Sequence, residues 1–175
     1  MRSEHVPPTM RRAGTGEIAD VLAVLDEVAG WLDARGVRQW PPRFERVRVE
    51  PAVLAGETWL AVDDEHVLAT VTLDRADRLW ADHPASATYV HRLAVRRVAA
   101  GLGGRILGWA ARRAAAEGCH YLRLDCVASN RRLRDYYEAA GFRHRGDVEV
   151  TGPPGGRGEP GSAVGVSRYE LALPG

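Results

Sequence analysis

The 175 residues are enough for one domain with a sizeable core, and 45% hydrophobic with 27% charged residues is an ordinary globular mixture. The formal net charge is +1, so no strong overall field attracts nucleic acid or an acidic membrane surface. All 24 basic residues are arginines, so there is no lysine to form a Schiff base with a substrate.

The cysteines, the hydropathy and the N-terminal residues exclude further classes. Cys119 and Cys126 form no CxxC pair, so neither a zinc cluster nor a disulfide framework is indicated, and we expect no metal. No apolar run reaches the ~18 residues that a membrane-spanning helix requires, and MRSEHVPPTMRR lacks the apolar core of a secretory signal. We expect a cytoplasmic protein without membrane contact, with a flexible tail at residues 1–8 and one domain over residues 9–175.

The first half of the chain predicts a short strand, two helical segments and a hairpin. TMRRA is expected to be extended, and apolar residues then recur at steps of three and four, which predicts a helix capped by Thr15 and ended by Gly36. A bend near Gly30 would divide this helix in two. QWPP breaks the chain. A weak helix is then predicted over residues 43–56. A hairpin follows, with strands at 59–62 and 67–73 and a turn at 63–65, and a further strand is predicted over 88–95.

The second half alternates strands with helices. After a glycine-bearing loop we predict a helix over residues 104–117, a strand over 121–128 and a short helix over 129–141. Two final strands are predicted over 142–150 and 166–173. The low-complexity stretch 151–165 predicts a mobile surface loop. This order predicts an α/β (α+β) domain whose mixed, mostly antiparallel sheet has about six to seven strands flanked by about four helices, with a parallel strand–helix–strand crossover in the second half.

The glycine loop RRVAAGLGGR, from Arg96 to Arg105, joins a predicted strand to a predicted helix. Glycines permit a tight turn, and they also let the backbone amides at a helix start approach an anion such as phosphate. The loop alone favours the plain turn. A P-loop is excluded because that motif needs a lysine, and a Rossmann fingerprint is disfavoured because Ile106 stands where its third glycine belongs.

A second motif favours the interpretation of the glycine loop as a phosphate site over a plain turn. Leu93-Ala94-Val95 precedes the glycine loop, and SNRRLRDYYEAAGF follows it after one helix and one strand. This ordered pair resembles the GNAT family, the GCN5-related N-acetyltransferases, over roughly residues 57–146. In that family an L-x-V strand leads into Q/R-x-x-G-x-G/A, and N-x-x-A/L-x-x-x-Y-E-x-x-G-F follows the next strand. The second motif is here formed by Asn130, Leu133, Tyr137, Glu138, Gly141 and Phe142.

The resemblance implies a site for acetyl-CoA as cosubstrate. The L-x-V strand would bind the pantetheine arm through its backbone, with the Val95 amide as oxyanion donor, and Asn130 would contact the same arm while capping its helix. Val98 occupies the Q/R position, so the pyrophosphate cradle is expected to rely on backbone amides, helped by a flanking arginine. The implied cofactor-binding residues are Leu93, Ala94, Val95, Val98, Ala100, Gly101, Leu102, Gly103, Gly104 and Asn130.

Acetyl transfer to an amine also needs an acid and a base. Tyr137 matches the family's general acid, because a phenol suits proton donation to the departing thiolate. His91, on the same strand face as Leu93, is our candidate base, and a buried structural histidine is the competing interpretation. Asp125, Glu57 and a water chain stay open as alternative bases.

The acceptor pocket is expected in two aromatic loops, GVRQWPP and DRLWADH. Trp40 and Trp80 would form its walls, with Asp125 as a further substrate-binding residue, although Trp40 would serve equally well as a core residue. The predicted function is acetyl transfer from acetyl-CoA to a primary amine of a small molecule, or to a peptide or protein amino terminus, by direct attack. The resemblance is compatible with a monomer or a homodimer.

Two other functions stay open on the same fold. One is a non-catalytic acyl-CoA-binding or regulatory module. The other is a toxin-type acetyltransferase acting on aminoacyl-tRNA, which the near-zero net charge disfavours because RNA affinity depends mainly on neutralising phosphates.

Overall fold

The structure, a computed structural model, describes residues 7–64, 66–151 and 162–175. Within these residues seven strands form one mixed sheet in the order β1-β2-β3-β4-β5-β7-β6. Every neighbouring pair is antiparallel except β4 and β5, which confirms the predicted crossover. The strands are β1 (Thr9–Arg12), β2 (Thr58–Asp63), β3 (His66–Asp74), β4 (Ala87–Val95), β5 (Tyr121–Val127), β6 (Arg143–Thr151) and β7 (Ala163–Ala172).

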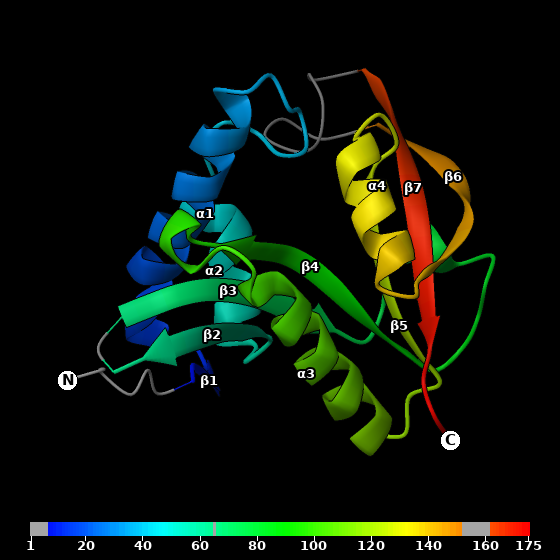
Figure 1. The fold of residues 1–175 in the computed structure, drawn as a ribbon, viewed down its shortest axis with the longest axis horizontal. Coiled ribbons are helices and arrows are strands. Elements are labelled where there is room, and N and C mark those ends of the chain that lie inside the picture. Colours follow the sequence, from blue (N-terminus) through cyan, green and yellow to red (C-terminus); the bar gives the residue numbers. More distant parts are fainter. Residues whose placement is uncertain (1–6, 65, 152–161) are drawn as a thin grey trace.

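Four α-helices cover the sheet (Figure 1). Helices α1 (Ile18–Asp33) and α2 (Arg46–Leu54) pack on one face of its first half, while α3 (Leu102–Ala116) and α4 (Arg131–Ala139) pack on the other face. The bend expected at Gly30 is wrong. Helix α1 runs through this residue unbroken, because its buried stripe, which includes Val21, Val24 and Leu25, continues to Ala29.

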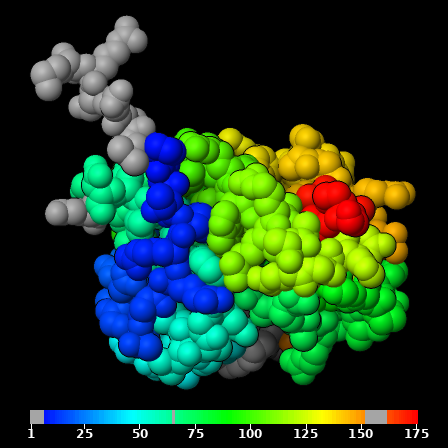
Figure 2. Space-filling model, turned by 90° about the horizontal axis from the view of Figure 1, so that it is seen from below, coloured from blue at the N-terminus to red at the C-terminus, as the bar shows by residue number. Residues whose placement is uncertain are grey.

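Each face of the sheet has its own apolar core. In one core, Ile106, Leu107 and Ala110 of α3 pack against buried side chains of β3, β4 and β5. In the other core, the buried side chains of α1 and α2 pack against Leu60 and Ala94. The N-terminal and C-terminal thirds of the chain, blue to cyan and yellow to red, occupy opposite sides of the molecule (Figure 2), because the strand order begins with β1 and β2 and ends with β7 and β6.

Two predicted mobile segments fall largely outside the described residues. Residues 1–6 of the predicted tail and 152–161 of the predicted loop are not among them, nor is residue 65 of the first hairpin turn. The last hairpin is longer than predicted, because Thr151 belongs to β6 and residues 163–165 belong to β7. Over the described part of the chain, no helix has the length and apolarity that crossing a membrane demands.

Strands β4 and β5 pair for only a short distance. Ala87–Tyr89 lies beside Tyr121–Arg123, and beyond these residues β4 stays with β3 while β5 stays with β7. A β-bulge marks β4 in this region: Thr72 pairs with His91 and Thr70 with Ala94, so two residues of β4 stand opposite one residue of β3. Arg92, within the bulge, has a φ of 50°. The two strands consequently part and leave an opening in the middle of the sheet.

Trp80, predicted to wall an acceptor pocket, is a buried anchor instead. Its side chain is only 2% exposed, and its ring lies between the guanidinium groups of Arg123, at 4.5 Å, and Arg168, at 5.3 Å. Arg123 donates to the His83 carbonyl at 2.8 Å and Arg168 donates to the Leu79 carbonyl at 2.8 Å. The indole and the two arginines thus fix the loop between β3 and β4 to strands β5 and β7. The prediction failed because those arginines are distant in the sequence.

Replacing this anchor should destabilise the whole domain. We expect Trp80→Ala to lower the free energy of unfolding by about 3–5 kcal/mol, because it removes a large buried side chain and leaves a cavity between two charged groups. Urea denaturation followed by circular dichroism measures this. Val47→Ala is the control, since Val47 is 68% exposed and should change stability by less than about 0.5 kcal/mol. Equal stability of the two variants would contradict the role given to Trp80.

Candidate active site

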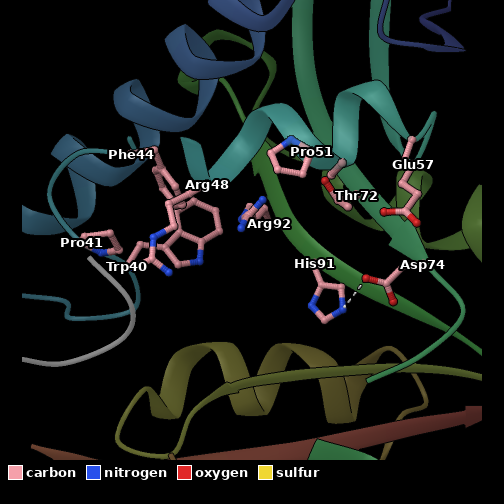
Figure 3. Close-up of a pocket in the computed structure, with 12 residues that line it drawn as sticks. Trp40, Pro41, Phe44, Arg48, Pro51, Glu57, Thr72, Asp74, His91 and Arg92 are labelled. Atoms are coloured by element: carbon pink, nitrogen blue, oxygen red, sulfur yellow. Dashed lines mark ion pairs between the residues drawn. The ribbon is translucent and has the colours of Figure 1, made fainter. Parts of the chain in front are cut away.

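Two cavities meet at the opening between β4 and β5. The β4–β5 cleft, of about 410 Å³, is bounded by β4, β5, the start of α3, helix α4, the end of α1 and the segment that follows α1. The α2 cavity, of about 630 Å³, lies between β3, β4, α2 and the segment before α2. Trp40, His91 and Arg92 line both cavities, and Figure 3 shows His91 and Arg92 of β4 facing the α2 cavity. These three residues form the boundary at which molecules in the two cavities would meet.

Most of the sequence-predicted site residues come together in the β4–β5 cleft. The predicted residues that line it are Trp40, His91, Leu93, Val95, Ala100, Gly101, Gly103, Asp125, Asn130 and Tyr137. Ala94 does not line it, because its side chain is buried in the core beneath α1 and α2. Val98 projects into solvent with 84% of its surface exposed, so its side chain takes no part in the cleft.

The glycine loop ends in the first turn of α3. A short 3-10 helix (Arg97–Ala99) leads to Gly101, whose φ of 98° is a left-handed conformation that a residue without a side chain adopts most easily. The amides that follow, including those of Leu102, Gly103 and Gly104, have no acceptor within the helix because they belong to its first turn. This end of α3 borders the β4–β5 cleft through Gly101 and Gly103, and its amides and dipole favour a bound anion.

Backbone groups on both sides of the opening face the cleft. Arg96 donates its amide to the Leu68 carbonyl, and because antiparallel pairs alternate, the amide of Val95 points away from β3 and towards the opening. On the other side, the amide of Val127 is bonded by the side-chain carbonyl of Gln39 at 3.1 Å. Gln39 also accepts from the Asn130 amide group at 3.4 Å, and it is only 5% exposed. The segment before α2 is thereby attached to β5 and α4.

His91 stands among three carboxylates. Its Nε2 atom lies 3.3 Å from Oδ2 of Asp74 and 3.7 Å from Oδ2 of Asp77. Asp77, His91 and Asp125 each offer an atom within 4.8 Å of the others. Among the described residues, this group alone has the side chains and spacing to hold a metal ion, and it is equally able to share protons. Asp77 reaches His91 from the loop that Trp80 anchors, where its Oδ1 also accepts from the Leu79 amide.

The surroundings of this cluster shift two protonation equilibria. Burial opposes the charging of His91, but the hydrogen bond to Asp74 and the charges of Asp74, Asp77 and Asp125 favour it, so the net effect is a raised pKa for His91. Burial raises the pKa of Asp77, although the Leu79 amide and His91 act in the opposite direction. His91 therefore holds a proton more strongly than a free histidine does, and a carboxylate partner is always beside it.

Tyr137 and Asn130 come from the second motif. Tyr137 is buried on α4, packs against Phe142 and Tyr169 with ring centroids 5.9 Å apart, and lines the cleft. Asn130 caps α4, its side-chain oxygen accepting from the Leu133 amide at 3.2 Å. The hydroxyl of Tyr136, which we did not single out, lies against the start of α3, because a β-carbon at Gly103 or Gly104 would come within 3.4 Å of it.

The sequence did not reveal three residues that shape the site. Arg92 enters both cavities only because of the bulge, and a bulge depends on the register with another strand. Gln39 acts through a contact with a strand far along the chain. Asp77 lies beside His91 because of the fold of the β3–β4 loop. A single sequence carries no local signal for any of these contacts.

Comparisons with known proteins show which proteins this chain is similar to. The model of the acetyltransferase (GNAT) family matches residues 25–142. An uncharacterized N-acetyltransferase of Bacillus subtilis, YesJ, is 34% identical over 143 residues, which cover 72% of this chain and 76% of that protein.

Solved structures share the fold at lower identity. A GNAT-family acetyltransferase from Listeria monocytogenes has a TM-score of 0.77 at 20% identity, with 99% of both chains covered. YncA of Salmonella typhimurium, a putative acetyltransferase whose structure holds acetyl-CoA, has a TM-score of 0.68 at 13% identity over 97% of this chain and 96% of that one. An agmatine N-acetyltransferase has a TM-score of 0.65 at 17% identity over 96% of this chain and 100% of that one.

Replacing Asp74 tests the electrostatic role of the cluster. Because the pKa of His91 is raised by folding, its contribution to stability is complete below the pKa of the unfolded histidine, about 6.5, and is lost as the pH rises through the folded value. We expect Asp74→Asn to lower the pKa of His91 in an NMR titration. The loss of unfolding free energy should be largest below about pH 6.5 and should shrink at alkaline pH.

The matched control for Asp74→Asn is Asp33→Asn, because Asp33 is an exposed carboxylate at the end of α1. It should leave the His91 titration unchanged. An unaltered pKa of His91 in Asp74→Asn would show that the carboxylate cluster does not control this proton.

Proposed function

The chain belongs to the acetyltransferase (GNAT) family and is an acyltransferase, and we propose that it moves an acetyl group from acetyl-CoA to a primary amine of a small molecule. The use of acetyl-CoA is supported by the similar structure of YncA, which holds that molecule. The choice of a small amine is supported by the similarity to an agmatine N-acetyltransferase.

The observation that carries this proposal is the meeting of two cavities at one strand. Direct acetyl transfer requires a thioester and an amine to reach the same point from different sides, with little freedom to move apart. The β4–β5 cleft supplies a channel for the pantetheine arm, and the α2 cavity supplies a chamber for the amine. Both end at His91 and Arg92, so the reacting atoms would lie beside these residues.

The cosubstrate would be held mainly by backbone groups. The first turn of α3 after Gly101 suits the pyrophosphate, since its free amides and dipole attract negative charge without a lysine. The amide of Val95 is aimed into the opening and suits the oxyanion that forms when the amine attacks the carbonyl carbon. Asn130, on the other side of the cleft, would contact the pantetheine arm while it caps α4.

Two side chains would manage the protons. The attacking amine must lose a proton, and His91 in its neutral form accepts it. The carboxylate of Asp74, 3.3 Å away, then stabilises the imidazolium that results. The departing thiolate must gain a proton, and the phenol of Tyr137 in the same cleft is the donor. The base takes a proton from the attacking amine and the acid gives a proton to the departing thiolate, so each residue transfers one proton in each turnover.

Substituting Gly101 tests the phosphate cradle. Gly101→Val should weaken acetyl-CoA binding by about tenfold or more, because a β-branched residue is strained at a φ of 98° and would displace the first turn of α3. Isothermal titration calorimetry with acetyl-CoA gives the dissociation constant directly. Gly118→Val is the matched control, since Gly118 has a φ of 79° at the opposite end of the same helix and lines neither cavity. Equal affinities of the two variants would place the pyrophosphate elsewhere.

Removing one hydroxyl tests the proton donor. Tyr137→Phe should lower kcat by about 10²-fold or more while the dissociation constant for acetyl-CoA stays nearly unchanged, because the ring continues to pack against Phe142 and Tyr169. Turnover is measured as CoA release with a panel of primary amines. Tyr121→Phe is the control, because the phenol of Tyr121 lines neither cavity. Unchanged turnover of Tyr137→Phe would eliminate this phenol as the acid.

A further inference from the structure

We propose that the acceptor is a free α-amino acid with a large apolar or aromatic side chain, bound as a zwitterion in the α2 cavity. The inference rests on the acetyl transfer proposed above and narrows its acceptor. It is based on the positions of the charged and aromatic side chains in the wall of the α2 cavity. These positions favour a free amino acid over two other acceptors, a polyamine and the amino terminus of a peptide.

The bulge in β4 places a base and a cation next to each other. In a regular strand, consecutive side chains point to opposite faces, so His91 and Arg92 would be separated by the sheet. The bulge lets both side chains line the same two cavities. An α-amino acid carries its amine and its carboxylate on one carbon, so an amine beside His91 puts the carboxylate within reach of the neighbouring guanidinium.

Charges of opposite sign occupy opposite parts of the cavity wall. Arg48 of α2 and Arg92 lie on the side of Trp40 and Phe44, whereas Asp74 and Glu57 lie on the other side of His91 (Figure 3). A cation is favoured near the carboxylates and an anion near the guanidinium groups, and a guanidinium binds a carboxylate through paired hydrogen bonds. A zwitterion satisfies both sides at once.

The remaining wall of the α2 cavity suits an apolar side chain. Trp40 and Phe44 meet edge to face with centroids 5.5 Å apart, and Pro41 and Pro51 add further apolar surface. With a volume of about 630 Å³, the cavity has room for more than a glycine or an alanine. A large side chain in contact with the rings would exclude water from the cavity and strengthen the ionic contacts within it.

The two other acceptors fit this wall less well. A polyamine has no anionic group, so it would bring a second positive charge towards Arg48 and Arg92. The amino terminus of a peptide replaces the carboxylate with a neutral amide, which forms weaker hydrogen bonds to a guanidinium. Only a free carboxylate, or an anion of the same shape, uses both arginines.

Matched pairs of acceptors test the inference. CoA release is measured with phenylalanine and phenethylamine, tryptophan and tryptamine, leucine and isoamylamine, and arginine and agmatine, along with the methyl ester of each amino acid. We expect kcat/KM to be at least tenfold higher for the amino acid than for its decarboxylated partner or its ester. Phenylalanine, tryptophan and leucine should be better acceptors than glycine.

A variant of Arg48 shows whether the carboxylate is the group recognised. Arg48→Gln should reduce kcat/KM for amino acids by about 10- to 100-fold, mainly through KM, and should leave the decarboxylated amines within about twofold of the native enzyme. Arg48→Lys should recover part of the loss. Arg46→Gln is the matched control, because Arg46 lies on the same helix but pairs with Glu50 outside the cavity. Acetyl-CoA affinity and the thermal midpoint verify that each variant is folded.

The outcomes separate this inference from the function on which it rests. Turnover of the amines at a rate equal to or above that of the amino acids overturns the amino-acid acceptor and leaves the acetyltransferase intact. An equal loss of activity towards both members of each pair in Arg48→Gln also overturns it. Absence of acetyl-CoA binding, together with no CoA release from any acceptor, overturns the proposed function and the inference with it.

Discussion

The early end of the pairing between β4 and β5 is the constraint on which the rest of the site depends. A sheet strand presents amides and carbonyls along both edges, and buried groups of this kind need partners. Where the two strands part, the side chain of Gln39 bonds the amide of Val127, while the amide of Val95 is directed towards the cleft. One interrupted ladder thus produces a channel through the sheet and a donor at its centre. The glycine loop begins directly after β4 ends, so the start of α3 borders the same channel.

The second structural feature on which the site depends is the bulge in β4. It turns a strand that would separate two neighbouring side chains into one that presents His91 and Arg92 to the same space. The α2 cavity and the β4–β5 cleft are consequently joined by His91 and Arg92 of one strand together with Trp40, and the strand backbone helps to set the relative position of their contents. Reactions between two bound molecules depend on this kind of rigid placement.

The sequence predicted the order of the elements and much of the cleft, because helix periodicity, strand alternation and the two motifs are local patterns. It predicted His91 and the glycine loop for the same reason. It missed contacts that depend on the whole fold. The aromatic loop around Trp80 suggested a pocket wall, but Arg123 and Arg168 of later strands bury it. Likewise, the residue at the Q/R position, Val98, points into solvent because a 3-10 turn precedes Gly101.

The loop after β3 carries two kinds of charged contact that respond differently to acid. Asp77 reaches His91, whose charge changes as the pH crosses its raised pKa, whereas the guanidinium groups beside Trp80 stay charged over that range. The two contacts therefore depend differently on pH. Protonation of His91 changes the charge beside Asp77, whereas Arg123 and Arg168 keep their charge beside Trp80, so the anchor of this loop does not depend on the protonation state of His91.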